Sequence, residues 1–578
     1  MPKATPARTS LGIRFFFPTL WGYRREWIRP DLIAGLTVWA VLVPESLAYA
    51  SIAGVSPVVG LYAAPPALLL YAALGSSRHL VAGPMSATAA LSAATVGALI
   101  AAGSDDFVTF TTTLALCTGI AALLAGLLRL GFLASFISEP VIKGFIIGLA
   151  LTIIAGQLPK LIGVESGSGD FFEKLWDLAT QLGAISGTTL LVGVGSLIVV
   201  LMLRRVAPLL PGSLVAVLLG IVAVAAFDLD DRGVAIVGEI KSGLPSLGLP
   251  DLGLSEAGQL IPGAVGIMLV GFAEGLGAAK TYAEQRHYDI DANRELLGLG
   301  GANVAAGLAG GMVVNGSLSK TAVNGAAGAH TQLSGLVVAA MTVITLLFLT
   351  GLFEQLPEAT LAAVVIAAVI ELVDIKSLIE FNRVFTRRLG RAFGIAARPD
   401  FIAAMAAMMG VLIFDTLPGL FIGIATSILL LLYRASRPYV AVLGKVPGTA
   451  DQYGDVDRHP ENAQSPGIVV LRVESGLFFA NADWVRAHIR RHAETPGIHT
   501  IVIDAESIPS IDLTAVRVLN NLADDLNRTG TRLLFARDVG LVRDVVRRAE
   551  PSGRLLRVYP TVQTAVDAAS TEGADPDA

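Results

Sequence analysis

Three charged side chains lie inside stretches of sequence that are otherwise apolar. Glu45 and Glu274 each interrupt a run of apolar and small residues, and Lys320 interrupts a third. A charged side chain deep in a membrane is costly, and where it occurs it tends to mark an ion pathway, a proton relay or a substrate site. Two carboxylates and one ammonium group could together bind protons and an anion.

Two short segments share the pattern G-x-(M/L)-S-x-T-A, at residues 83–89 and 316–322. Each reads as an extended approach followed by the start of a helix, where free N–H groups and the helix dipole favour an anion. Inside a bilayer, such a helix end is tolerated when its irregular backbone is buried in protein. Lys320 adds a full positive charge. Four hydroxyl side chains can add donors: Ser86, Thr88, Ser319 and Thr321.

The two halves of the chain keep the same order and nearly the same spacing. Glu45 lies 41 residues before Ser86, and Glu274 lies 45 residues before Ser319. These residues fall in the first and third apolar spans and in the eighth and tenth. Because an offset of seven spans is odd, the two halves are inverted in the membrane. Inverted repeats with interrupted helices are typical of secondary transporters that bind substrate near the midplane.

The two carboxylates also indicate how transport could be driven. A proton bound to a carboxylate favours a nearby anion, and the anion favours the proton in turn. This relation predicts symport of protons and an anion. Sodium is less favoured, because Ala278, one turn after Glu274, offers only its backbone.

Each of these residues also has a purely structural interpretation. The hydroxyl side chains could cap helices without binding a ligand. Lys320 could form a salt bridge with Glu274 or extend toward the membrane surface. Either glutamate could be satisfied by Lys320 or by backbone donors. The sequence leaves these alternatives open.

The composition indicates a membrane protein. Of the 578 residues, 53% are hydrophobic and 15% are charged, whereas soluble domains average about 25% charged residues. The apolar residues form runs long enough to cross a bilayer. We therefore predict an α-helical polytopic membrane protein with fourteen spans. They start near residues 31, 58, 81, 109, 132, 185, 212, 262, 292, 319, 333, 358, 399 and 417.

Lysine and arginine concentrate in every second loop, as expected of cytoplasmic loops, and the short turn between the tenth and eleventh spans is the one neutral exception. Arg129 and Arg204 follow even-numbered spans, whereas Asp228 lies in a loop on the opposite side. This pattern predicts a multi-pass protein of the cell membrane with both termini in the cytoplasm. Residues 1–30 are expected to form a cytoplasmic leader and residues 31–437 the transmembrane domain.

Composition and motifs disfavour several other functions. The net charge of −5 includes no basic block, so nucleic acid is not an expected partner. Cys117 is the only cysteine, so the chain has no intramolecular disulfide and no cysteine-based metal cluster. No G-x-x-x-x-G-K-(S/T) motif occurs, which disfavours an ATP-driven pump. We expect no cofactor, no metal ion and no enzymatic activity.

The composition changes after the last predicted span. Residues 438–578 hold 15 of the 42 basic residues and 19 of the 47 acidic residues. We predict a small α/β domain at 438–570 and a disordered tail at 571–578. Short β-rich runs alternate with amphipathic runs in the order 467–474, 481–494, 499–505, 514–528 and 531–536.

Several stretches together resemble the sulfate permease (SulP) anion transporter family over nearly the whole chain. The resemblance implies a seven-plus-seven inverted repeat with core and gate subdomains and an anion site between the third and tenth spans. It also implies a cytoplasmic STAS domain, a homodimer and elevator-like alternating access. The stretches are VPESLAYA at 43–50 with its continuation to residue 62, SSRH at 76–79, IDANREL at 290–296 and GSLSKTAVN at 316–324.

The resemblance also implies roles for individual residues. The family's first-span glutamate or glutamine falls on Glu45, and its eighth-span acid falls on Glu274. Glutamate at position 45 resembles members that run on protons. The family usually has arginine where this chain has Lys320, and lysine keeps the charge but lacks the bidentate geometry of arginine. The amides and hydroxyls of the anion site fall on Ser86, Ala87, Ser319, Lys320 and Thr321.

Residues 503–505 and 510–515 resemble the strand, loop and helix start of STAS domains, which in turn resemble bacterial anti-sigma-factor antagonists. Those antagonists are phosphorylated on a serine or threonine directly after the loop aspartate. Here Leu513 follows Asp512, so a phosphorylation switch is not expected. We expect Asp512 to cap or position the next helix and Thr514 to be a helix-start hydroxyl. The domain would serve dimer contact, trafficking or regulation.

These observations predict a proton-coupled importer of a small oxyanion, with sulfate first. The expected partners are the anion, protons, membrane lipid and a second copy of the chain. A transporter or exchanger of bicarbonate or a C4-dicarboxylate with the same fold is the nearest alternative. A membrane anion sensor is a third hypothesis, but a sensor has no need of the paired Glu45 and Glu274.

Overall fold

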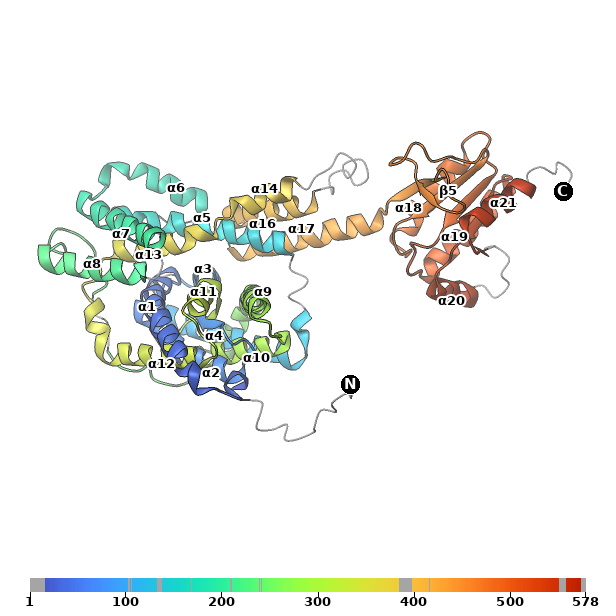
Figure 1. Cartoon of the computed structure of the whole chain (residues 1–578). Helices are drawn as coiled ribbons and strands as arrows, with labels where there is room; N and C mark the ends of the chain where they lie inside the picture. Colours follow the sequence, from blue (N-terminus) through green and yellow to red (C-terminus); the bar gives the residue numbers. More distant parts are fainter. Residues whose placement is uncertain are drawn as a thin grey trace. The chain divides into compact units, whose positions relative to one another are not determined.

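The computed structural model consists of two compact units, one helical and one built around a sheet (Figure 1). The first comprises Met1–Arg383 and Asp400–Ser427, and the second comprises Val384–Pro399 and Ile428–Ala578. The structure describes residues 16–101, 104, 106–132, 138–167, 169–207, 210–238, 240, 242–383, 398–414, 416–549 and 558–572.

Long apolar runs fold into helices here because a helix satisfies its backbone polar groups internally, which a bilayer requires. The elements up to the unit boundary, which falls within α17, are α1 (Ile28–Ile52), α2 (Pro57–Leu74), β1 (Val81–Gly83), α3 (Ser86–Gly97), α4 (Phe107–Leu127), α5 (Glu139–Ile162), α6 (Phe171–Thr180), α7 (Gly187–Val206), α8 (Gly212–Phe227), α9 (Leu254–Arg286), α10 (Ala292–Leu308), β2 (Asn315–Ser317), α11 (Leu318–Ala326), α12 (Leu333–Ile344), α13 (Glu358–Val369), α14 (Ile375–Arg383), α16 (Pro399–Phe414) and α17 (Thr416–Ser436).

Within the described residues, eight helices are long and apolar enough to cross a membrane, and three shorter apolar helices accompany them. Most predicted spans start within a few residues of a helix or strand. Helix α9 is an exception: it begins at Leu254 and not near residue 262, because Glu256 caps a polar first turn by accepting a hydrogen bond from the Gly253 amide (3.2 Å). Helix α5 begins at Glu139, and residues 133–137 lie outside the described part. The total of fourteen spans stays a prediction.

Two short helices of the first unit, α6 and α14, are missing from the sequence prediction. Both are too short and too rich in charged residues to read as spans. Helix α1 begins at Ile28, within the last three residues of the predicted leader, and the boundary of that leader stays a prediction. Residues 1–15 of that leader lie outside the described residues.

A two-stranded ribbon joins the two repeats. Strands β1 and β2 pair antiparallel, with Ala82 opposite Gly316 and Gly83 opposite Asn315. In the repeated pattern Gly83 is equivalent to Gly316, and Ala82 is therefore equivalent to Asn315. Exchanging the two halves converts each of these pairs into the other, as a two-fold axis requires. The register thus supports the inverted repeat.

Small residues bring neighbouring helices into close contact. Helices α4 and α10 pack along most of their lengths. A Cβ atom added to Gly119 would lie 2.5 Å from the amide nitrogen of Val304, and one added to Gly300 would lie 2.8 Å from that of Leu123. Packing of backbone against backbone through glycine is a common way for helices to associate in membranes.

The second unit contains a six-stranded sheet in the order β4-β3-β5-β6-β7-β8. Strands β5 to β8 are parallel, and β3 runs antiparallel to both β4 and β5. The elements are β3 (Val440–Lys445), β4 (Tyr453–Asp455), β5 (Ile468–Val473), α18 (Ala482–Ala493), β6 (Thr500–Asp504), α19 (Leu513–Arg528), β7 (Arg532–Ala536), α20 (Gly540–Ala549), β8 (Val558–Tyr559) and α21 (Val562–Glu572).

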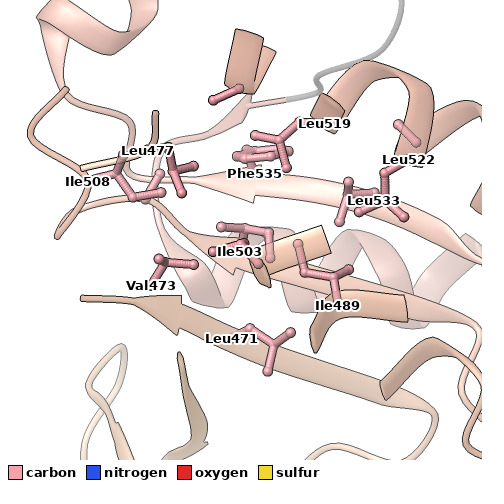
Figure 2. Packing of buried hydrophobic residues seen from close by; sticks show 14 of the residues in the cluster. Leu471, Val473, Leu477, Ile489, Ile503, Ile508, Leu519, Leu522, Leu533 and Phe535 are labelled. Carbon is pink, nitrogen blue, oxygen red and sulfur yellow. The ribbon is translucent and has the colours of Figure 1, made fainter. Parts of the chain in front are cut away.

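Five elements of this domain were predicted, whereas β3, β4, β8, α20 and α21 were not. Strands β5 to β7 and helices α18 and α19 match the five predicted runs within one residue. Helix α21 continues to Glu572 and so includes the first two residues of the predicted tail. Residues 573–578 lie outside the described part. Figure 2 shows the main core of the domain, where Leu471, Ile489, Ile503 and Leu533 are among the buried side chains.

The end of α17 is held against α18 within the second unit. Nδ2 of Asn481 donates to the carbonyl oxygen of Ala435 (3.2 Å), and Nε1 of Trp484 donates to that of Pro438 (3.3 Å). The guanidinium of Arg437 lies over the Trp484 ring, 5.1 Å from its centroid, and over Tyr433 at 4.6 Å. The chain at Ala435 and Pro438 is therefore hydrogen-bonded to the start of α18.

Candidate functional site

The β1-β2 ribbon places the starts of α3 and α11 in one region of the first unit. The amide of Val81 in β1 donates to Oγ1 of Thr321 in α11 (3.1 Å), which ties the first turn of α11 to the opposite repeat. Helices α1 and α9 are equivalent in the repeat, and each packs against both α3 and α11 (Figure 1). The structure therefore brings the helices that carry Glu45 and Glu274 to the two S-x-T segments.

The start of α3 offers backbone amides without a capping side chain. Ser86, Ala87 and Thr88 form its first turn, and all three are at most 5% exposed. The first amides of a helix have no partner within the helix, and Met85 in front of it supplies no side-chain cap. The Thr88 hydroxyl turns back to donate to the carbonyl oxygen of Met85 (3.3 Å). An anion is the natural partner for such amides.

The start of α11 differs, because it carries its own cap. Oγ of Ser317 accepts a hydrogen bond from the amide of Lys320 (3.4 Å) and lies 3.1 Å from Oγ of Ser319. Leu318 and Ser319 are exposed, whereas Lys320 and Thr321 are fully buried. Ser319 thus faces accessible space, and the next residues point into the protein.

Lys320 forms a buried ion pair with Glu45. Nζ donates to Oε2 of Glu45 over 2.8 Å, and the two side chains are 0% and 4% exposed. The ammonium also lies 5.0 Å from the ring centroid of Tyr49, one turn further along α1. The structural alternative of a salt bridge to Glu274 is therefore wrong for this conformation, because α11 presents the lysine to α1.

Glu274 lacks such a partner. Its Oε2 is shielded from solvent and has no hydrogen-bond partner in the described part of the chain. The next residue of α9 lies close to β2, since a Cβ atom added to Gly275 would be 3.1 Å from Oδ1 of Asn315. Glu274 is thus partly buried, with one shielded and unpartnered carboxylate oxygen, on a helix that contacts the candidate anion site.

Side-chain amides satisfy the irregular backbone that precedes α3. Nε2 of Gln332 donates to the carbonyl oxygens of Ser77 and Leu80 (2.9 and 2.8 Å), and Nδ2 of Asn324 donates to that of His79 (2.9 Å). Both amides come from the opposite repeat. They meet the requirement that non-helical backbone at membrane depth be buried in protein and hydrogen-bonded.

Two further buried carboxylates hold loops, and the sequence analysis did not assign them this role. Asp31 accepts hydrogen bonds from the amide and the hydroxyl of Thr331 (3.2 and 2.7 Å). Glu295 accepts from the amides of Ser76 and Ser77 (2.8 and 2.9 Å). Both acids are fully buried and lie in the first turn of a helix. That position is the one sequence signal that distinguishes them from Glu45 and Glu274.

In the α/β domain, Asp512 is the N-cap of α19. Oδ1 accepts from the Ala515 amide (2.7 Å), and Oδ2 accepts from the Phe479 amide (2.8 Å). Thr514 is exposed in the first turn of α19, next to Leu513. Asp512 therefore joins the helix start to the loop after β5.

Comparisons with known proteins agree with this architecture. A model described as the sulfate permease family matches residues 28–390, and a STAS domain model matches residues 459–565. This chain belongs to the sulfate permease family. A protein of Mycobacterium tuberculosis named a probable sulfate transporter is 38% identical over 94% of this chain and 96% of its own length. High affinity sulfate transporter 1 of Stylosanthes hamata is 31% identical, covering 92% and 82%.

Solved structures place this sulfate permease family member in a known transporter fold. Murine solute carrier 26 family member A9, an anion transporter in an inward-facing state, aligns with a TM-score of 0.86 at 21% identity over 99% of this chain and 96% of its own. The transmembrane domain of the cyanobacterial bicarbonate transporter BicA aligns with a TM-score of 0.60 at 24% identity, over 69% and 98%. The protein thus has a helical membrane-transporter fold with a C-terminal STAS domain, in a family of multi-pass anion transporters and not of enzymes.

Proposed function

We propose that this protein imports a small oxyanion, sulfate first, together with protons. The observation that carries the proposal is the buried ion pair between Lys320 and Glu45 at the start of α11. Two relatives named as sulfate transporters, one mycobacterial and one from a plant, support sulfate as the substrate. The ion pair supports the coupling to protons, because protonation of Glu45 would release Lys320 to the anion.

The proposed anion site combines two helix starts with one charge. The amides of Ser86 and Ala87 on α3 and the hydroxyls of Ser319 and Thr321 on α11 supply donors around the anion. Lys320 supplies the positive charge. Together these groups balance the charge of an oxyanion without a metal ion, as helix N-termini commonly do for sulfate and phosphate.

Protons and anions would be coupled through the ion pair. While Glu45 is ionised, it holds the ammonium of Lys320 and competes with the anion for that charge. Protonation of Glu45 ends the competition and removes a repelling negative charge. By linkage, the bound anion favours protonation of Glu45 to the same extent. Proton and anion therefore enter together, which is the requirement for symport.

Glu274 is proposed as the second proton-coupling residue. Its buried Oε2 has no partner within the described residues, and a buried charge that is unpaired is costly. An approaching anion adds to this cost, because both groups are negative. We therefore propose that Glu274 is protonated while the anion is bound.

The helices form two groups that could move relative to each other during transport. Helices α1 to α4 pack with α9 to α12, whereas α5, α7 and α13 pack with one another. We propose that the first group is the core, which carries the anion past the second group, the gate, by elevator-like alternating access. We further propose a homodimer in the cell membrane with both termini in the cytoplasm, as the family resemblance implies.

Bicarbonate and C4-dicarboxylates are the alternative substrates. The fold of the transmembrane part is shared with a protein described as a bicarbonate transporter. Helix-terminus donors accept anions of several shapes, so selectivity depends on the cavity around them. Transport by exchange would use the same site.

Uptake of labelled sulfate into proteoliposomes tests the proposal. With an acidic exterior and a more alkaline interior, we expect sulfate to accumulate above its external concentration. Without the pH gradient, we expect equilibration only. Labelled bicarbonate and fumarate are measured in parallel. Uptake of one of these anions but not of sulfate would contradict the substrate, and sulfate uptake that ignores the gradient would contradict symport.

A further inference from the structure

The C-terminal domain contains a cavity that the proposed transport function does not use. Its volume is about 230 Å³. It lies where the parallel strands end: Ala505 follows β6 directly, and Phe535 is the second-last residue of β7. Open α/β sheets bind ligands outside the carboxyl ends of their strands.

The walls of this cavity are mainly apolar. Leu477, Ile508, Leu519 and Phe535 line it, and they belong to the main core of the domain (Figure 2). Helix α20 adds Val542 and Val546 to the apolar lining. Apolar side chains around an empty space lose the dispersion contacts that a filled core provides. The walls therefore favour an apolar occupant.

Among the described residues that line the cavity, the formal charges sum to one positive charge. Three charged residues line it: Asp538, Arg543 and Arg547. Nε of Arg543 donates to both carboxylate oxygens of Asp538 (3.1 and 3.0 Å), so these two charges cancel. Arg547, one turn further along α20, is exposed and forms no ion pair within the described residues. The rim thus favours an anionic group beside an apolar one.

Size and charge together define the ligand. A space of this volume holds on the order of eight groups the size of a water molecule, at ~30 Å³ each. The hydrocarbon part of a ligand with about eight carbon atoms therefore matches it in volume. Inorganic sulfate or phosphate would leave the apolar walls uncovered, and a neutral chain would leave Arg547 without a partner.

We infer that the C-terminal domain binds a medium-chain carboxylate, with its hydrocarbon chain in the cavity beside α19 and α20 and its carboxylate at Arg547. The site lies wholly within the second unit. The inference does not depend on the anion site of the transmembrane part, so it can be tested independently of the proposed transport.

Photoaffinity labelling of the full-length protein in lipid nanodiscs tests this inference. The probe is octanoic acid with a diazirine on its chain, and mass spectrometry locates the labelled peptides. We expect labelling within residues 505–519 and 540–549, with protection by excess octanoate. Arg547→Gln should raise the probe concentration needed for half-maximal labelling about fivefold, as expected for loss of one charge-assisted hydrogen bond. Val546→Phe, which fills the cavity, should raise this concentration further.

Arg548→Gln is the matched control, because Arg548 is also exposed on α20 but does not line the cavity. Its labelling should equal that of the unmodified chain. Thermal unfolding of each variant separates loss of the site from loss of the fold. Protection by octanol as strong as by octanoate would overturn the role of Arg547. Protection by ATP but not by octanoate would assign the cavity to a polar ligand, and labelling confined to transmembrane helices would overturn the site.

Discussion

Glu45 and Glu274 occupy equivalent positions in the two repeats, but their surroundings differ. Glu45 on α1 shares a 2.8 Å ion pair with Lys320 on α11. Under the repeat, Lys320 corresponds to Ala87 on α3. The symmetry mate of the ion pair would therefore join Ala87 to Glu274, and alanine has no charge to offer. This difference explains why Oε2 of Glu274 is buried without a partner.

The backbone of the site is thus symmetric while its charge is not. The β1-β2 register obeys the two-fold relation, and α1 and α9 contact the same two short helices. A second lysine at position 87 would place two ammonium groups near one anion. With a single lysine, one carboxylate is ion-paired, and one oxygen of the other has no partner within the described residues.

The largest effect is expected from removing the ammonium group. Lys320→Met should lower the initial rate of sulfate uptake by about 100-fold or more, because the anion loses its only full positive charge at the site. The variant also leaves Glu45 buried and unpaired, which typically costs about 3–5 kcal/mol of stability. Uptake into proteoliposomes and thermal unfolding in detergent measure the two effects.

Two control variants separate transport from stability. In Lys320→Met/Glu45→Gln the unpaired charge is removed, so the thermal stability should recover while uptake stays low. Lys143→Met breaks the half-exposed ion pair to Asp374 (2.8 Å), and we expect a change below about 1 kcal/mol with uptake preserved. Normal uptake by Lys320→Met would rule out the lysine as the anion's partner.

The next effect concerns pH dependence. Uptake by the unmodified protein should rise as the external pH falls, because protonation of Glu45 frees Lys320. In Glu45→Gln the side chain is always neutral, so uptake should lose most of its pH dependence and keep only the part due to Glu274, while sulfate affinity changes by only a few-fold. Rates measured across a series of external pH values at constant internal pH report the difference.

Glu295→Gln is the matched control for this loss of charge. Glu295 is also fully buried, but it accepts hydrogen bonds from the amides of Ser76 and Ser77. We expect this variant to be less stable, because an amide NH₂ group meets N–H donors, and to keep its pH dependence. If Glu45→Gln keeps the pH profile of the unmodified protein, Glu45 has a structural role only.

Much of this arrangement could be predicted from the sequence because its signals are local. Run lengths of apolar residues located the helices, and the pattern shared by residues 83–89 and 316–322 located both helix starts of the site. The five central elements of the C-terminal domain followed from their periodicity. Strand β4, at one edge of the sheet, carries no such signal, since it has three residues and one of them is glycine. Strand β3 lies between β4 and β5 and was also missed, because it follows the last apolar helix directly and includes Gly444.

The partners of the charged residues could not be predicted, because they depend on how distant helices pack. Lys320 lies 46 residues after Glu274 and 275 residues after Glu45, yet it pairs with the more distant one. Gln332 likewise binds carbonyl groups more than 250 residues away. The sequence shows that alanine at position 87 is equivalent to lysine at position 320. That Lys320 pairs with Glu45 follows only from the packing of α1 against α11.

A smaller effect is expected from moving the lysine to the other repeat. In Lys320→Met/Ala87→Lys, the new ammonium should reach Glu274, where Ala278 replaces the bulk of Tyr49. We expect recovery to about one tenth of normal sulfate uptake, limited by overpacking of about 1–3 kcal/mol at a buried position. Adding Glu274→Gln should remove the pH dependence of the recovered uptake. Recovery that is indifferent to Glu274→Gln would contradict the equivalence of the two carboxylates.

The smallest effect tests the helix starts. Helix α11 is capped by Ser317, whereas Met85 leaves α3 uncapped. Ser317→Ala should cost about 1 kcal/mol of stability and change the KM for sulfate little. Met85→Ser gives α3 a hydroxyl that competes with the anion for its amides, so the KM should rise about two- to fivefold without any change of charge. A rise in KM for Ser317→Ala but not for Met85→Ser would indicate that the anion binds at the start of α11 alone and not at both helix starts. The asymmetry of the caps would then be a consequence of folding and not of anion binding.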